Sequence, residues 1–335
     1  MEVNMLKSII YAALCLFFAP AAGLAQVNTG ESLFFSPDGK YFAANFHGNI
    51  NLGTIKASER KFIRSFNAER DSEGKIYSFF GFTPDSRRLA VSYDSKSELR
   101  FLSLNGELQS AIPAHPLLKV SPGFKWAVER QFLGPATRHS LSSVTGEGVS
   151  PKFSLPEEFL WSVFSSDDKL LAFVYGLKDK KSGVRSHILK VMDTRTGKYL
   201  RQYSVKNKND SMIDAVAFSP NGKLLAYAVD DKVTVVNTAT WETSSFVSSD
   251  GADSGMLAFS RNGAYLAVNY AGSSVKIYSL PGYRVVVNRN FEGKNALYVV
   301  DIAFSRDSSF LGVLGSRRAG DESSFSVRFI DLPKK

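Results

Sequence analysis

The chain has 335 residues, of which 44% are hydrophobic and 22% are charged, and these values exclude a disordered or fibrous protein. Aromatic residues make up 13%, with 26 Phe and 13 Tyr, which favours strands because flat rings pack well on a pleated sheet. The net charge of +9 is spread over the whole chain, so it indicates an anionic partner only weakly.

Residues 1–25 have the pattern of a signal peptide. Lys7 precedes an apolar run from Ile9 to Ala19, which is too short to span a bilayer and suits a signal-peptide core. Small residues at Gly23 and Ala25 predict cleavage before Gln26. The alternative is an N-terminal membrane anchor, which the early end of the apolar run at Pro20 disfavours.

The start of this segment has two interpretations. Translation from Met1 places Glu2 in the region that is usually basic, whereas a start at Met5 gives the more usual sequence MLKSII. Cys15 is the only cysteine, and Leu14 before it does not fit a lipoprotein attachment site. The mature chain therefore has no disulfide, thiolate metal site or cysteine nucleophile. We predict a soluble, exported protein, periplasmic or secreted, with no transmembrane segment after cleavage.

One phrase recurs seven times along the rest of the chain. It reads FSPDGKYFAA at its first occurrence and FSPNGKLLAYAV at the fifth, with a degenerate third copy, VSPGFKWAVE. The copies begin at Phe35, Phe82, Val120, Phe164, Phe218, Phe259 and Phe304. Their spacings of 47, 38, 44, 54, 41 and 45 residues match a four-stranded propeller blade and exceed leucine-rich or ankyrin repeats.

Each copy predicts a β-hairpin. An apolar strand ends in Ser-Pro-Asp-Gly or a variant, in which Pro presets φ, Asp or Asn bonds backbone amides and Gly accepts positive φ. The following strand contains small residues, as in Leu224–Tyr227. Third strands are predicted at Leu99–Leu104, Ile188–Asp193, Val233–Asn237, Val275–Leu280 and Val327–Leu332, and a fourth, for example, at Tyr283–Val287. The sequence therefore predicts an all-β, seven-bladed propeller of four-stranded antiparallel blades over residues 26–335.

The last blade is predicted to be irregular. Its strands are expected near Leu297–Ser305, Phe310–Gly315 and Phe325–Leu332. Either this blade has three strands, or residues 26–30 supply a short fourth one.

Over residues 31–335 the chain resembles WD-repeat propellers and their bacterial WD40-like relatives. The resemblance implies a ring of blades that serves as a binding platform. No third strand ends in Trp-Asp, although Met192-Asp193 and Ile330-Asp331 come close, and the Gly-His pair that opens such repeats is missing. The His–Asp network that the resemblance implies within each blade is therefore not expected here.

Histidines and aspartates do not form a catalytic or metal-binding pattern. The histidines His47, His115, His139 and His187 lack metal-ligand spacing, and we interpret them as surface or hairpin residues. The aspartates Asp38, Asp85, Asp168 and Asp307 are read as occupying one repeated turn position, where Asp stabilises a turn through backbone bonds. No calcium-loop spacing follows them.

Enzyme motifs are also missing. The sequence has no Gly-x-Ser-x-Gly elbow, phosphate-binding loop or Cys-x-x-Cys-His haem motif. We therefore predict a non-catalytic protein with no cofactor and no metal. The alternative is a propeller enzyme or small-ligand binder, such as a lactonase-like hydrolase, with its site at the axial channel.

Long loops are expected on one face, opposite the short turns. They are predicted at Ala68–Lys75, Gly176–Ser186, Lys206–Ser211 and Ser316–Ser324. Variable loops on a rigid scaffold commonly bind partners. The candidate partner-binding residues are the basic ones in these loops: Lys178, Lys180, Lys181, Arg185, Lys206, Lys208, Arg317 and Arg318. We expect a monomer that binds a protein or peptide, and acidic residues on that partner would complement the basic loops. Solvated loop charge is the alternative interpretation, and nucleic acid is disfavoured because no aromatics interleave with these lysines.

Overall fold

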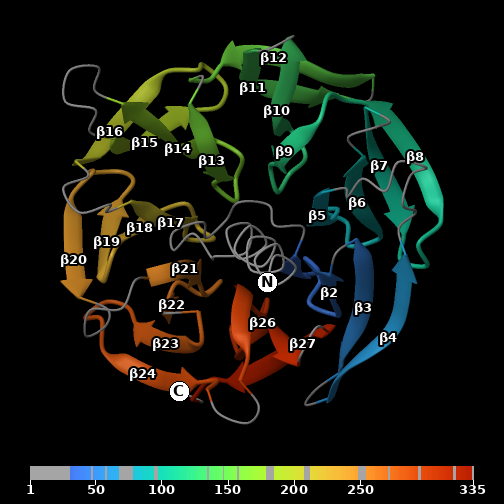
Figure 1. The fold of residues 1–335 in the computed structure, drawn as a ribbon, viewed down its shortest axis with the longest axis vertical. Coiled ribbons are helices and arrows are strands. Elements are labelled where there is room, and N and C mark those ends of the chain that lie inside the picture. The colour runs from blue at the N-terminus through green and yellow to red at the C-terminus, as the bar shows by residue number, and fades with distance from the viewer. Residues whose placement is uncertain are drawn as a thin grey trace, which may run out of the picture.

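The computed structural model describes residues 31–46, 48–56, 59–67, 78–93, 97–133, 136–145, 147–156, 158–178, 185–206, 212–247, 254–270, 272–292, 296–319 and 322–333. These residues form 27 strands in seven antiparallel sheets, which stand as blades around one axis (Figure 1). The predicted all-β, seven-bladed propeller is confirmed.

Six blades have four strands, and within each blade the strands follow one another from the axis outwards. Blade one contains β1 (Ser32–Phe35), β2 (Tyr41–Phe46), β3 (Asn49–Lys56) and β4 (Glu59–Asn67). Blade two contains β5 (Ser78–Phe82), β6 (Arg88–Tyr93), β7 (Glu98–Ser103) and β8 (Leu108–Pro113). Blade three contains β9 (Leu117–Val120), β10 (Trp126–Leu133), β11 (Ala136–Thr145) and β12 (Gly148–Ser154). Blade four contains β13 (Phe159–Phe164), β14 (Leu170–Lys178), β15 (Arg185–Asp193) and β16 (Tyr199–Lys206).

Blade five contains β17 (Ile213–Phe218), β18 (Leu224–Val229), β19 (Lys232–Asn237) and β20 (Thr243–Val247). Blade six contains β21 (Ser254–Phe259), β22 (Tyr265–Tyr270), β23 (Ser274–Ser279) and β24 (Val285–Asn290). Blade seven contains only β25 (Tyr298–Phe304), β26 (Phe310–Ala319) and β27 (Glu322–Asp331). Blade seven therefore has three strands in the described part of the chain, and residues 26–30, the alternative source of a fourth strand, lie outside the described residues.

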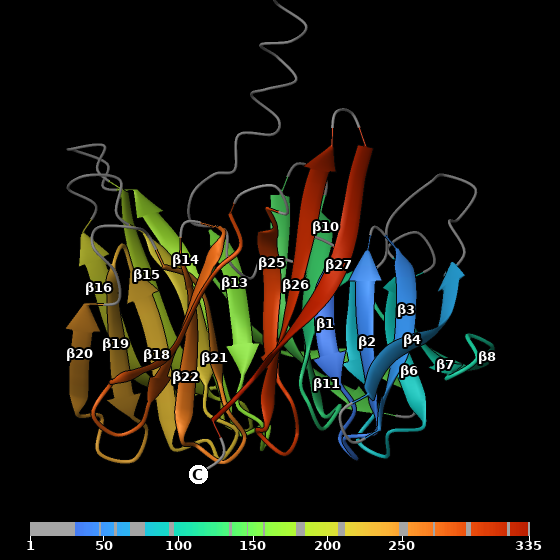
Figure 2. The same ribbon diagram turned by 90° about the horizontal axis from the view of Figure 1, so that it is seen from below.

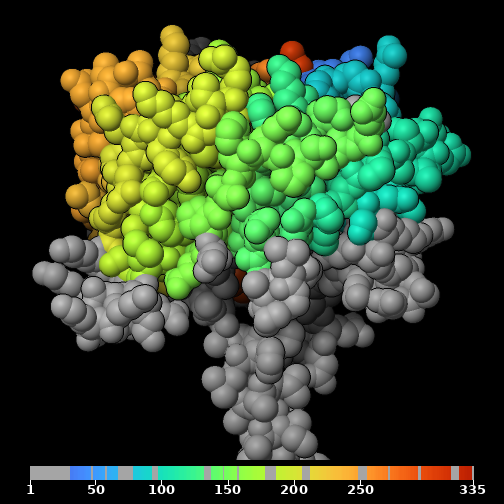
Figure 3. All heavy atoms as spheres, turned by 90° about the horizontal axis from the view of Figure 1, so that it is seen from above, coloured from blue at the N-terminus to red at the C-terminus, as the bar shows by residue number. Residues whose placement is uncertain are grey.

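The hydrophobic core lies between the blades. Each of seven apolar clusters joins two neighbouring blades, and the cluster between blades five and six includes Ala217, Val235, Leu257 and Tyr270. The small residues of the second strands are fully buried there, as Ala226 shows with 0% exposure. Blades two to five present a continuous outer wall in Figure 3. Because each sheet buries its side chains against its neighbours, a blade is stable only within the ring.

Aromatic packing closes the ring between blades seven and one. The phenyl rings of Phe35 and Phe310 lie 5.5 Å apart, those of Phe42 and Phe329 5.3 Å apart, and the closest pair, Phe46 with Phe325, is separated by 4.9 Å. Aromatic pairs of this kind add to the free energy of area burial.

Polar contacts reinforce the same closure. Arg60 of β4 lies 3.9 Å from the centroid of the Phe310 ring, and its Nη2 is 2.6 Å from Oδ1 of Asp331. Nearer the axis, the backbone N–H of Leu33 donates to Oδ2 of Asp301 at 2.7 Å. Blade seven is thus attached to blade one by side chains, in place of a shared sheet.

The propeller has two unlike faces. The turns between first and second strands lie on one side, which we call the turn face, and the connections between second and third strands lie on the other, which we call the hairpin face (Figure 2). Two predicted loops are shorter than expected, because their ends continue the strand ladders: Lys178 pairs with Arg185, and Ala319 pairs with Glu322. Parts of Gly176–Ser186 and Ser316–Ser324 are therefore strand. The predicted loops Ala68–Lys75 and 207–211 lie outside the described residues.

Candidate binding surfaces

Seven turns of one geometry form the turn face. In each, the fifth residue of the repeated phrase has positive φ and donates its N–H to the carbonyl of the second residue; Gly222, with φ 69°, donates to Ser219 at 2.8 Å. The seven residues are Gly39, Ser86, Phe124, Asp168, Gly222, Gly263 and Ser308. Four of these positions therefore carry a side chain in a backbone region that favours glycine.

The turn aspartates stabilise the turns locally. Oδ1 of Asp38 accepts hydrogen bonds from the Ser36 hydroxyl at 2.6 Å and from the Lys40 N–H at 3.1 Å. Asp85 and Asp307 have the same pattern with their own neighbours. The hydrogen bond from the Thr83 hydroxyl lowers the pKa of Asp85, against the opposing effect of burial. The predicted turn role is confirmed for these three aspartates.

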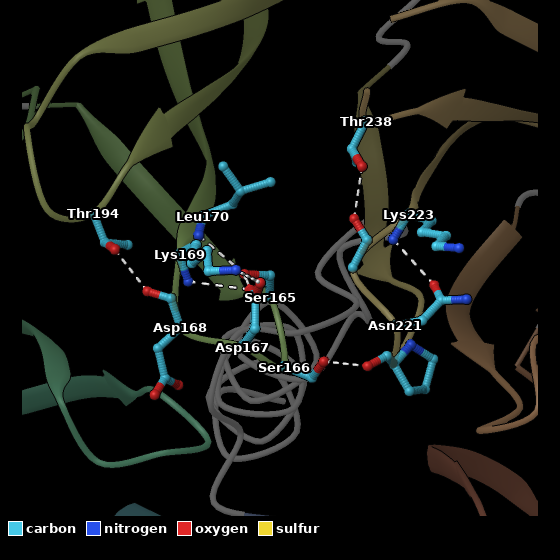
Figure 4. A network of polar contacts seen from close by, with 12 residues as sticks. Ser165, Ser166, Asp167, Asp168, Lys169, Leu170, Thr194, Asn221, Lys223 and Thr238 are labelled. Carbon is cyan, nitrogen blue, oxygen red and sulfur yellow. Dashed lines mark hydrogen bonds and ion pairs between the residues drawn. The ribbon is translucent and has the colours of Figure 1, made fainter. Parts of the chain in front are cut away.

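Asp168 has a different role from the predicted one. The turn position in blade four is held by Asp167, whose Oδ1 accepts from the Ser165 hydroxyl at 2.7 Å. Asp168 follows it at the positive-φ position with φ 62°, and its Oδ1 accepts from the Gly123 N–H of blade three at 2.8 Å. Its own carbonyl accepts from the Thr194 hydroxyl at 2.6 Å (Figure 4). Counted from the first phenylalanine of each copy, Asp167 and not Asp168 aligns with Asp38, Asp85 and Asp307, so the prediction named the wrong one of two adjacent aspartates.

Side chains at the positive-φ positions link neighbouring turns. Ser86 Oγ accepts from the Asp38 N–H at 2.9 Å, and Ser308 Oγ accepts from the Asn262 N–H at 3.1 Å. The Ser166 hydroxyl donates to the carbonyl of Pro220 in blade five (Figure 4). With the bond to Asp168, side chains at the positive-φ positions bridge three of the seven blade boundaries in the described residues, and Ser166, at the third position of its turn, bridges a fourth. Many polar groups of the turn face thus form hydrogen bonds with other residues of the protein itself.

The turns between third and fourth strands carry aromatic packing. Gly106 and Gly197 have positive φ, and a Cβ at either would lie within 3 Å of a phenylalanine from the preceding blade, Phe66 or Phe153. In blades five and six the same position holds Trp241 and Tyr283, with φ 63° and 52°. The left-handed backbone costs such residues about 1–2 kcal/mol each.

Packing against the preceding blade offsets this cost. Tyr283 stacks on Phe246 of blade five with ring centroids 4.6 Å apart, and its hydroxyl bonds Ser244. Arg201 of blade four lies 5.4 Å from the Trp241 ring. Both aromatics therefore pack on the outer strand of the preceding blade, which gives their strain a structural explanation.

A groove of about 770 Å³ opens on the turn face between blades five and six. Leu224, Val235, Leu280 and Pro281 form its apolar lining, with Tyr283 and Glu242 at polar positions. The lining residues, all in the described part of the chain, include no histidine, lysine or cysteine. The groove can accept apolar groups but offers no nucleophile paired with a base.

The innermost strands surround the axis, and two of them carry residues of opposite charge. Lys119 lies on β9 of blade three and Asp301 on β25 of blade seven, and the two interact electrostatically. Burial raises the pKa of Asp301 to about 6, although the N–H groups of Leu33 and Ile302 and the charge of Lys119 oppose that shift. Burial lowers the pKa of Lys119, and Asp301 partly opposes it. Sequence reasoning missed this pair, because neither residue belongs to a motif.

Blade three also contains a buried polar cluster. Glu129 is fully buried, and its carboxylate accepts hydrogen bonds from the Ser142 hydroxyl and, at 3.3 Å, from the backbone N–H of His115. His139 is only 7% exposed and stacks on Phe159 at 4.9 Å, so the expectation of a surface or hairpin histidine is wrong there. Burial and the nearby Arg130 lower the pKa of His139. These contacts hold β9, β10 and β11 together.

The predicted basic residues fall into two groups. Lys178 ends β14, Arg185 begins β15 and Lys206 ends β16, so the three occupy the hairpin-face end of adjacent strands in blade four. Lys180, Lys181 and Lys208 lie outside the described residues.

Arg317 and Arg318 belong to β26, on a different side of the ring (Figure 1). Arg317 is half-buried, and its Nε has no hydrogen-bond partner among the described residues. The sequence predicted that all eight basic residues lie in loops. The structure places Arg317 and Arg318 in a strand, apart from the basic residues of blade four.

The described residues hold no group of three or more His, Cys, Asp or Glu side chains placed to bind a metal ion. No helix in this part of the chain is long and apolar enough to cross a membrane.

No family model and no curated protein matches the sequence. Among solved structures, the chain is similar to hydrazine synthase of Kuenenia stuttgartiensis, with a TM-score of 0.62 and 14% identity over 92% of this chain and 98% of that one. It is also similar to the β-propeller domain of Cps50 (Swd1) from Myceliophteria thermophila, with a TM-score of 0.64 and 14% identity over 91% of this chain and 97% of that one. At such identity the likeness concerns the fold: the chain is a seven-bladed β-propeller similar in structure to WD40-type propellers.

Proposed function

We propose that this protein is an exported, non-catalytic propeller that binds a protein or peptide partner through its hairpin face. Propellers commonly serve as binding platforms, because elements from several blades meet on one rigid face. The signal-peptide pattern of residues 1–25 supports export to the periplasm or the exterior.

The observation that carries this proposal is the charge at the end of blade four. Lys178 and Arg185 are direct cross-strand partners at the last pair of the β14–β15 ladder, and Lys206 ends the adjacent strand. Three basic residues thus fall at one end of three adjacent strands, and an acidic protein surface is the electrostatic complement of such a group.

The test compares two charge reversals of equal size. The variant Lys178→Glu/Lys180→Glu/Lys181→Glu should bind the partner recovered from an envelope extract more slowly, with a flatter dependence of the association rate on salt. The control variant Lys198→Glu/Lys223→Glu/Arg261→Glu changes exposed residues near the turn face and should associate like the wild type. Equal association rates and salt slopes in both variants would refute a role for the blade-four lysines.

A second candidate function has one observation in its favour. Lys119 and Asp301, on the innermost strands of blades three and seven, have a lowered and a raised pKa respectively, and perturbed pKa values cluster at functional sites. A lactonase-like hydrolase or a small-ligand binder could use it. Hydrolysis of lactone or ester substrates by the mature protein, abolished by Lys119→Met, would establish this alternative and overturn the non-catalytic proposal.

A further inference from the structure

Blade seven lacks the outer strand that the other six blades possess, and this leaves the edge of β27 open in the described residues. Figure 1 shows β27 between the outer strands β24 and β4 of the neighbouring blades. We propose that this edge accepts an extended segment of a partner protein, in which apolar and acidic residues alternate, as a fourth strand antiparallel to β27. The inference rests on the proposed function for the class of partner, a protein with acidic residues. It places the binding of that partner on a surface separate from the end of blade four.

The ladder between β26 and β27 determines which backbone groups face outwards. Leu332 donates its N–H to Ser309 at 2.9 Å, and alternate residues of an antiparallel strand point to opposite sides. The backbone groups of Ile330 and Arg328 therefore face β26, and those of Val327 and Phe329 face the open side. In blade four, Asp193 occupies the position that corresponds to Asp331. Its backbone N–H donates to the carbonyl of Lys198, away from the second strand, at 2.9 Å, as expected for the odd-numbered residues of β27.

The missing strand also leaves apolar side chains uncovered. Val327 and Phe329 are half-buried and pack towards blade one. The residues that correspond to Val327 in blades four to six, Leu189, Val233 and Val275, are 0% exposed, and those that correspond to Phe329, namely Val191, Val235 and Ile277, are 0–4% exposed. Next to Phe329, the ring of Phe62 from β4 is 45% exposed and contacts Phe42. The blade-one side of the edge is therefore mainly apolar, with the Arg60 guanidinium 5.4 Å from the centroid of the Phe329 ring and paired with Asp331.

The blade-six side of the same edge is basic. Arg328 pairs with Val313, which packs against blade six, so its side chain lies on that face of blade seven. Arg289 of β24 pairs with Val275 and lies on the face of blade six that packs on blade seven. Both arginines are exposed and form no ion pair with a described residue. An added strand would thus meet apolar side chains and the paired Arg60 and Asp331 on one face, and two arginines without a described ion-pair partner on the other.

This difference between the two faces selects the occupant. Side chains alternate between the faces of a strand, so a segment with valine-like and glutamate-like residues in alternation satisfies both walls at once. Strand addition to an open edge uses main-chain hydrogen bonds for affinity and alternate side chains for specificity. The outer strands β20 and β24 have five and six residues, which gives the length of segment that fits.

The binding experiment uses synthetic peptides and the full mature protein. The probe is a fluorescently labelled heptapeptide of alternating valine and glutamate, and its controls are a valine–lysine peptide and a peptide of the same composition with contiguous glutamates. Fluorescence anisotropy should show binding of the alternating acidic peptide at least tenfold tighter than that of either control. Equal affinity for all three peptides, or no binding of any, would overturn the proposal.

Two variants locate the site. Val327→Pro removes an N–H that faces away from β26, where proline is compatible with an edge strand, and should weaken binding at least tenfold. Arg328→Glu should shift the preference towards the valine–lysine peptide, whereas Lys232→Glu, an equal charge change in blade five, should leave affinities unchanged. Where Val327→Pro does not fold, as judged by its thermal melt, the reversal by Arg328→Glu decides. Unchanged preference in Arg328→Glu would refute the assignment.

Hydrogen exchange identifies any other occupant. The amides of Val327 and Phe329 should exchange rapidly in the isolated mature protein and at least tenfold more slowly with the acidic peptide. Slow exchange at every protein concentration would mean that the chain covers its own edge, and slow exchange only at high concentration would mean a second copy; either result overturns the proposal. Loss of partner binding in the blade-four variant with normal peptide binding at β27 would separate the two proposals, as would the converse.

Discussion

Gly222 offers a direct test of how the turn face is built. It has φ 69°, and a Cβ placed there would have its nearest neighbour, an oxygen of Asp167, at 3.9 Å. Substitution therefore creates no clash, and its cost comes from the backbone conformation alone. The left-handed region costs an L-residue about 1–2 kcal/mol, and a β-branched residue more. The substitution also lowers the conformational entropy of the unfolded chain, which offsets about 0.4–1 kcal/mol of this cost.

For Gly222→Val these quantities give a net loss of about 2 kcal/mol in the free energy of unfolding. Gly222→Ser has a smaller backbone cost, because serine is not β-branched, and it adds a hydroxyl where Ser86 and Ser308 bond the preceding turn. One such hydrogen bond is worth about 0.5–1.5 kcal/mol, so the serine variant should be at least about 1 kcal/mol more stable than the valine variant. The difference between the two variants contains both the smaller strain and the inter-blade bond.

Thermal unfolding of the mature proteins checks both values. With an unfolding entropy of about 2.1 cal/mol/K per residue over about 300 residues, a loss of 2 kcal/mol lowers Tm by about 3 °C. Partner binding should change little, because the turn lies on the opposite face from the blade-four lysines. An unchanged Tm for Gly222→Val, or equal decreases for the valine and serine variants, would refute the reasoning.

Three further predictions concern ring closure, pH and processing. Arg60→Met should destabilise the protein by about 1–3 kcal/mol, since it removes a partly buried cation from Phe310, whereas Asp331→Asn should cost less than about 1 kcal/mol because Asp331 is exposed; chemical denaturation of both variants measures this, and equal losses would contradict it. Native Asp301, with a pKa of about 6 against an ordinary 3.8, binds its proton up to a higher pH than the unfolded chain does, so the wild type should lose stability relative to Asp301→Asn as the pH rises from about 4 to about 6. Unfolding free energies at several pH values test this, and parallel curves would show that Asp301 does not titrate as described. Finally, N-terminal sequencing of the exported protein should begin at Gln26, and an intact residue 1–25 segment in the membrane fraction would contradict the processing prediction.

The repeated phrase was sufficient to predict the blades. Its apolar strand, polar turn and second strand are local features that recur at a regular spacing, so the sequence by itself determined the fold class, the number of blades and the positive φ of Gly222 and Gly263. Local turn chemistry likewise explained Asp38, Asp85 and Asp307. The prediction was wrong for Asp168, because the fourth position of that copy is Asp167, which makes the local turn bonds, whereas Asp168 bonds Gly123 of another blade, a contact that the sequence does not reveal.

The candidate sites depended on contacts between blades. The bond between Leu33 and Asp301 joins residues 268 positions apart, and the pKa of Asp301 depends on Lys119 of another blade. Periodicity reports which side of a strand a residue occupies but not which residue of the next blade it meets. The exposure of Val327 and Phe329 could not be predicted for the same reason, since it follows from the absence of a neighbouring strand in the described residues. The sequence therefore determined the repeating unit, and the tertiary structure decided what each unit presents to its neighbours and to a partner.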